Sequence, residues 1–180
     1  MKKLLVLLTA LLLLVLGACG NSEVSTGGDG NSTEKKEETT EQVENDEPKE
    51  ETGKTVDASA QSVEAAGMKV GLGEIKIADD KISVGINLEN TTDGALSFYP
   101  DQGSAVIGDM QLSANMFMTS GSVGGDVQGG VKQEGVIEFL PPEGKTIDTE
   151  AITEIKLVFG DVATEDFMTV KPVEFTVPVK

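Results

Sequence analysis

The feature that most constrains the fold of this chain is the segment KISVGINLEN, residues 81–90. Its apolar side chains alternate strictly with polar or small ones. Four apolar residues alternate there with four polar or small ones: Ile82, Val84, Ile86 and Leu88 against Ser83, Gly85, Asn87 and Glu89. Successive side chains of a strand point to opposite faces of a sheet, so this pattern predicts a β-strand with one buried face. No later segment has a helical period of any length, and we therefore expect an all-β fold.

Short apolar segments bounded by turn residues recur along the rest of the chain. We expect strands over residues 70–77, 81–90, 96–99, 104–107, 110–114, 136–140, 155–159 and 173–179. Asp79-Asp80 and Gly108-Asp109 are typical of the tight turns that join antiparallel neighbours. Pro178 cannot donate to a ladder, so the last strand lies at an edge or ends there. Short strands at this spacing predict an antiparallel sandwich.

Three further expectations concern a possible helix, a glycine-rich loop and the aromatic residues. Residues 56–67 (VDASAQSVEAAG) are expected to form a short helix with Asp57 as its N-cap and Gly67 as its end. The glycine-rich segment 120–130 is expected to be a flexible loop between strands, and it is where a partner would first be sought. Six phenylalanines and Tyr99 are expected mostly to pack in the core.

The N-terminus has a short basic start, an apolar run and then the only cysteine of the chain. The run covers residues 4–16, which fits a secretory signal and is too short for a membrane-spanning helix of about 20 residues. Its last residue is Leu16, and Gly17, Ala18 and Cys19 follow directly. This sequence resembles the lipobox of bacterial lipoproteins.

The resemblance implies cleavage before Cys19 and attachment of acyl chains at its thiol. Two or more acyl chains hold a protein stably on a bilayer, whereas one holds it only marginally. We therefore expect residues 1–18 to be a lipoprotein signal peptide. The mature protein is then anchored through Cys19 to the extracytoplasmic face of the cell membrane. The alternatives are an ordinary secretory signal with an incidental cysteine, and an uncleaved anchor.

Residues 19–55 are expected to be a disordered acidic linker between the lipid and the folded domain. From Gly20 to Thr55 the sequence has eleven acidic residues, four lysines and no aromatic residue. Such a segment cannot bury enough apolar surface to offset its ordering entropy. A tail that folds on a partner is the alternative interpretation. The folded domain then covers residues 56–180, which is long enough for one core.

The whole chain is acidic, with a formal net charge of −17 at pH 7. Nucleic-acid binding requires basic groups that neutralise phosphates, so we expect no nucleic-acid partner. An anionic membrane surface repels the chain, so the lipid must hold it there. The charge favours cationic partners, and a protein or a component of the cell envelope is expected.

The residue types of the common catalytic sites are missing. There is no histidine, and lipidation would consume the thiol of Cys19, so serine–histidine, cysteine–histidine and the usual zinc sites are excluded. A hydrolase with two carboxylates stays open, but such clefts have aromatic platforms, and the aromatic residues are assigned mostly to the core. We therefore expect no enzymatic activity and no cofactor.

Metal binding is the alternative function, with calcium favoured because it takes oxygen ligands alone. The candidate ligands lie in predicted loops: Asp79, Asp80, Asn90 and Asp93. Their spacing is not that of an EF-hand, and aspartate and asparagine are common in turns for backbone reasons. The thioethers of Met116 and Met118 suit Cu(I), but the histidines that usually accompany them in copper carriers are missing.

Three stretches of the domain, ISVGINLENTTDGALSF, AVIGDMQL and GGVKQEGVIEFLPPEG, carry a second resemblance. They resemble the immunoglobulin-like, telokin-like domains of Gram-positive lipoproteins of unknown function, over residues 68–180. The resemblance implies an immunoglobulin-like sandwich that serves as a binding or accessory module without a reaction of its own. Loops at one end of the sandwich or an exposed sheet edge would contact the partner.

Overall fold

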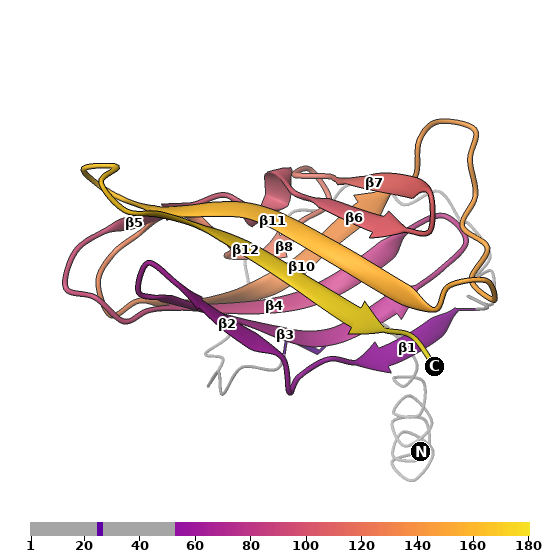
Figure 1. Cartoon of the computed structure of the whole chain (residues 1–180), viewed down its shortest axis with the longest axis horizontal. Coiled ribbons are helices and arrows are strands. Elements are labelled where there is room, and N and C mark those ends of the chain that lie inside the picture. The colour runs from indigo at the N-terminus through magenta and orange to yellow at the C-terminus, as the bar shows by residue number, and fades with distance from the viewer. Residues whose placement is uncertain (1–24, 27–52) are drawn as a thin grey trace, which may run out of the picture.

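The computed structural model describes residues 25–26 and 53–180 of the chain (Figure 1). This part forms twelve β-strands and a single 3₁₀ turn, and none of it is α-helical. The elements are β1 (Lys54–Asp57), β2 (Ser62–Ala65), β3 (Met68–Ile77), β4 (Ile82–Asn90), β5 (Leu96–Phe98), η1 (Pro100–Gln102), β6 (Ser104–Ile107), β7 (Met110–Ala114), β8 (Ser120–Gly121), β9 (Gly125–Val127), β10 (Lys132–Leu140), β11 (Glu154–Thr164) and β12 (Val170–Pro178).

All pairings between these strands are antiparallel. Hydrogen bonding follows the order β1-β3-β4-β10-β7-β6-β11-β5-β9, with β2 beside β3, β8 beside β10 and β12 beside β11. The β6–β7 hairpin connects β10 to β11 within this order, because β7 pairs with β10 and β6 pairs with β11. The expected all-β antiparallel sandwich is confirmed.

The sandwich has two layers, one with β3, β4 and β10 and the other with β11 and β12, which cross in front of the first layer in Figure 1. The hydrophobic core fills the space between them. Three phenylalanine rings connect the layers at its centre. Phe159 of β11 lies between Phe139 of β10 and Phe175 of β12, with ring centroids 6.1 Å apart in both pairs. The alternating residues of β4 pack as the sequence predicts, since Ile82, Val84, Ile86 and Leu88 are all buried.

Each of the two predicted turns joins the two strands of a hairpin. Ala78 donates its N–H to the carbonyl of Lys81 around Asp79-Asp80, and Ile107 pairs with Met110 around Gly108-Asp109. The predicted edge is also confirmed, because β12 pairs only with β11 and its final residue is Pro178.

The short helix predicted over residues 56–67 is wrong. The end of β1, a turn and β2 occupy this segment. Ala66 and Gly67 have φ angles of 52° and 90° and form the two-residue loop of the β2–β3 hairpin. Asp57 caps a turn, since the N–H and the hydroxyl of Ser59 both donate to its Oδ1. Pairing with β3 outweighs the high intrinsic helix propensity of the alanines here, because propensity is weak compared with tertiary context.

One further expectation needs correction, and the expectation that the aromatic residues pack mostly in the core holds for four of the seven. The segment 120–130 is not only a loop, because it contains β8 and β9. The aromatic residues are divided between core and surface: Phe98, Phe139, Phe159 and Phe175 are buried, whereas Tyr99, Phe117 and Phe167 are exposed. Tyr99 lies between β5 and η1, and the other two exposed rings lie on loops, where no alternation of a strand directs them inward.

Candidate functional site

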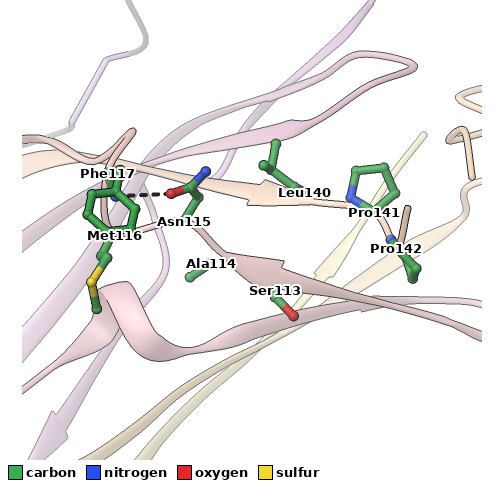
Figure 2. A pocket seen from close by; sticks show the side chains of 8 residues that line it. All are labelled: Ser113, Ala114, Asn115, Met116, Phe117, Leu140, Pro141 and Pro142. Carbon is green, nitrogen blue, oxygen red and sulfur yellow. Dashed lines mark hydrogen bonds between the residues drawn. The ribbon is translucent and has the colours of Figure 1, made fainter. Parts of the chain in front are cut away.

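A hollow with a volume of about 380 Å³ lies where β7 leaves the sheet beside the end of β10. Figure 2 shows Met116 and Phe117 at one end of it and Pro141 and Pro142 at the other. Ser113, Ala114, Asn115 and Leu140 complete the lining. Two neighbouring strand pairs, Leu140 with Ser113 and Phe139 with Ala114, fix the floor of the hollow.

Asn115 determines the shape of the loop at this hollow. Its backbone N–H donates to the carbonyl of Glu138 at 2.8 Å, which ties the loop to β10. Its Oδ1 accepts the N–H of Phe117 at 3.0 Å, and its carbonyl accepts the N–H of Met118 at 3.0 Å (Figure 2). The resulting Asx turn holds Phe117 outward with 91% of its surface exposed.

The chemistry of this hollow is that of a binding surface. Its lining has no titratable side chain, so it offers no general acid or general base of the usual kinds. Met116 and Met118 beside Phe117 are also about half exposed, at 49% and 44%. A cluster of exposed apolar side chains at a concave surface is typical of a contact site for another molecule.

A second hollow, of about 300 Å³, lies on the other side of β7 and shares Ser113 and Ala114 with the first. Gln102, Ser104 and Gln111 give it a polar lining. The two hollows together present amide and hydroxyl groups next to exposed apolar ones. This combination suits a peptide or a protein surface, which has both main-chain polar groups and apolar side chains.

Exposed apolar side chains also lie at a second, separate place, the tip of the β11–β12 hairpin at the left of Figure 1. Phe167 and Met168 are 70% and 83% exposed there. Asp166 Oδ1 accepts the hydroxyl of Thr164 and the N–H of Met168, and these two bonds, the hydroxyl first, lower the pKa of Asp166 below its usual 3.8. Similarly, the hydroxyl and N–H of Ser59 lower the pKa of Asp57.

The candidate calcium ligands lie in two groups that the structure keeps apart. Asp79 and Asp80 are exposed in the turn before β4, whereas Asn90 is the last residue of β4 and Asp93 follows it. The nine residues of β4 between them span about 30 Å. Within residues 25–26 and 53–180, no three His, Cys, Asp or Glu side chains lie close enough together to hold a metal ion.

Asn90 is fully buried and has a structural role that sequence reasoning missed. Its Nδ2 donates to the carbonyls of Gly94 and Val127 at 2.8 Å, and its Oδ1 accepts the N–H and the hydroxyl of Thr92. The amide therefore organises the β4–β5 loop. The only signal in the sequence is an asparagine that continues the buried face of β4, two residues after Leu88.

The lipobox residues Leu16, Gly17, Ala18 and Cys19 lie outside the described residues. The prediction of acyl attachment at Cys19 therefore stays a prediction. In the described part of the chain, no helix is long and apolar enough to cross a membrane.

No protein-family model matches the chain, and no curated protein sequence matches it significantly. Among solved structures, it is similar to a functionally unknown protein from Listeria monocytogenes EGD-e, with 12% identity, a TM-score of 0.48, and 72% of this chain and 90% of that chain covered. The yjhA protein from Bacillus subtilis has 11% identity and a TM-score of 0.44, with 67% and 97% covered. The GAE domain of GGA2p from Saccharomyces cerevisiae has 17% identity and a TM-score of 0.34, with 66% and 96% covered. Structural similarities this remote support no assignment of function to this chain.

Proposed function

We propose that this protein is a membrane-anchored, extracytoplasmic lipoprotein that displays a non-catalytic, immunoglobulin-like binding module. The apolar run that ends in the lipobox-like sequence before Cys19 supports the anchor. The antiparallel sandwich with Greek-key-like crossing connections supports the immunoglobulin-like assignment, because strands adjacent in the sheet, such as β4 and β10, are distant in sequence.

The observation that carries the binding role is the exposure of Phe117 beside the hollow between β7 and β10. Placing a phenylalanine in water costs about 1.5–3 kcal/mol relative to burying it. Asn115 nevertheless holds this ring outward with two hydrogen bonds to the loop backbone. A partner that covers Phe117, Met116 and the proline wall would recover this free energy.

The partner is a protein or a protein-like component of the cell envelope. Aromatic and methionine side chains are enriched at the centres of protein interfaces. The polar hollow beside them provides hydrogen-bonding groups for a peptide backbone. Because the chain has a formal net charge of −17, cationic partners associate with it faster than anionic ones.

The test is photo-crosslinking on intact cells, with a photoreactive amino acid at position 117 of the full chain. Phe167 is the matched control, because it is also an exposed phenylalanine but lies at the distant β11–β12 tip. We expect a discrete adduct of one mass from position 117 and none from position 167. The absence of an adduct at 117, or the same adducts from both positions, would refute the binding surface.

The anchor has its own test, the variant Cys19→Ser. Serine cannot receive the acyl chains, so we expect either an uncut precursor or a protein that is released to the medium. Fractionation of cells followed by mass determination distinguishes these forms. A Cys19→Ser protein that is still mature and membrane-bound would contradict the lipoprotein assignment.

A further inference from the structure

The outer face of β3 and β4 has a trough whose floor has no side chains. Gly73 of β3 and Gly85 of β4 lie next to each other there, and both are buried. The register between the two strands shifts between Leu72 and Ile75, so that Gly73 and Glu74 together lie opposite Gly85. A bulge of this kind leaves one backbone N–H outside the ladder. In this case it is the N–H of Glu74 that bonds outside the β3–β4 pair.

Ser25 and Thr26, far from the domain in sequence, lie in this trough. The carbonyl oxygen of Ser25 accepts the N–H of Glu74 at 2.6 Å. A Cβ atom added at Gly73 or at Gly85 would overlap this same oxygen. Neither glycine has a positive φ, so their lack of a side chain is required by the close approach of Ser25 and not by their own backbone conformation.

Two further contacts hold Thr26 at the β10 side of the trough. Asn87 Nδ2 donates to the carbonyl of Thr26 at 2.8 Å, and the Thr26 hydroxyl donates to Glu134 Oε2 at 3.2 Å. Gly71 leaves room for this arrangement, because a Cβ there would overlap the amide of Asn87. Asn87 pairs with both Gly71 and Glu134 in the sheet, so all these groups lie in one row across three strands.

We propose that this glycine trough is the docking site for the chain's own N-terminal segment at Ser25–Thr26, and that the docked segment holds the domain close to the membrane. The Ser25 carbonyl gives the Glu74 N–H at the bulge an acceptor, and the glycines leave room for the main chain of Ser25–Thr26. The occupant is the segment of the same chain, because it lies in the trough in the structure. Docking shortens the free tether between lipid and domain.

The effect on the tether rests on the proposed lipid anchor at Cys19. Five residues lie between Cys19 and Ser25, and the six peptide steps that join these two residues reach at most about 20 Å. Without docking, the tether runs from Cys19 to β1 at Lys54, and a flexible chain of that length has a root-mean-square span of about 30–36 Å. The docked segment therefore keeps the trough face of the domain nearer to the bilayer.

Hydrogen exchange at the Glu74 amide, measured on the full chain in detergent, tests the docking directly. In Gly85→Ala the added methyl group occupies the position of the Ser25 carbonyl, so we expect the Glu74 amide to exchange about tenfold faster. Gly94→Ala is the matched control, because a Cβ there meets nothing within 4 Å and the residue has no positive φ. Unchanged exchange of Glu74 in Gly85→Ala would overturn the proposal.

A variant that lacks residues 20–30 separates docking from a general weakening of the sheet. It removes the segment and leaves every strand residue in place, so it must reproduce the faster exchange of Glu74. Slow exchange in this variant would overturn the proposal even if Gly85→Ala exchanges fast. Protection in the unaltered chain must also persist on a hundredfold dilution. Its loss on dilution would show that the segment comes from a second copy.

Energy transfer on vesicles tests the position of the domain. A donor dye at Phe167→Cys and an acceptor in the lipid report the distance for lipidated protein, and we expect Gly85→Ala to lower the transfer while Gly94→Ala leaves it unchanged. Equal transfer for all three proteins would overturn the shortened tether. A protein that never associates with vesicles, yet shows the expected exchange of Glu74, would refute the lipid anchor and leave the docking site in place.

Discussion

The side-chain amide of Asn90 donates to the main-chain carbonyl of Val127, and the two atoms lie 2.8 Å apart. Asn90 ends β4 and Val127 ends β9, and these strands are not neighbours in the sheet. The bond therefore connects the two layers at one end of the sandwich. It is formed by a fully buried side chain, so neither partner can replace it with a bond to bulk water.

We expect Asn90→Ala to destabilise the domain by about 2–4 kcal/mol, because it removes the amide that bonds the buried carbonyl of Val127 and the N–H of Thr92, and it leaves a cavity in a fully buried position. Chemical denaturation measures the change. Thr91→Ala is the control, since its hydroxyl makes one exposed bond to Gly67. A loss for Asn90→Ala no larger than for Thr91→Ala would contradict the role of the buried amide.

The two kinds of phenylalanine in this domain should respond differently to truncation. Phe159→Ala removes a buried ring that contacts both Phe139 and Phe175, and we expect a loss of about 3–5 kcal/mol. Phe117→Ala removes an exposed ring, and we expect a change within about 0.5 kcal/mol. Thermal melts of both variants decide this. A strongly destabilised Phe117→Ala would mean that the ring packs against the fold and does not await a partner.

Asp166 should make the β11–β12 tip sensitive to acid. Its pKa is lowered by the bonds from Thr164 and Met168, so the charged form stabilises the folded tip above the usual pKa of 3.8. This contribution is lost as the pH falls through the lowered pKa. We expect the amide of Met168 to lose protection from exchange below about pH 4, whereas in Asp166→Asn, which has no carboxyl group to titrate, we expect weaker protection with no such pH dependence. An identical profile for both proteins would refute it.

Calcium should leave the melting temperature of the protein unchanged. The candidate ligands Asp79 and Asp80 lie across the length of β4 from Asp93, and both lone-pair directions of Asn90 Oδ1 already accept bonds from Thr92. A ligand at one hundred times its dissociation constant would add about 2.7 kcal/mol. Differential scanning calorimetry with sub-millimolar calcium would detect that gain. An upward shift that is lost in Asp79→Asn would restore the metal-binding alternative.

Local alternation was enough to predict β4, and turn residues were enough to predict the hairpins at Asp79-Asp80 and Gly108-Asp109. The β2 strand was missed because four residues with two small side chains carry little period-two signal, and only the pairing with β3 makes them a strand. Phe117 lies outside every strand that the sequence predicts, so no alternation decides whether its ring is buried. Its exposure depends on the bond between Asn115 Oδ1 and the Phe117 N–H, which sequence does not show.

The glycine trough has a sequence signal that could have been used. Gly71, Gly73 and Gly85 occupy outward positions of strands whose other faces are apolar. Glycine weakens a strand interior, so repeated glycines on one face indicate close approach by another backbone. That the approaching backbone is Ser25–Thr26 depends on contacts across more than forty-five residues of sequence, and no local pattern encodes them.

The prolines of β12 also determine how copies of the protein meet. A strand accepts proline where the nitrogen faces away from its neighbour, so Pro172 and Pro178 place their missing donors on the free edge of β12. An incoming strand would find gaps in the row of N–H groups and could not extend the sheet there. The free edge of β12 is therefore closed to strand addition by another chain, although it is the edge of a nine-residue strand.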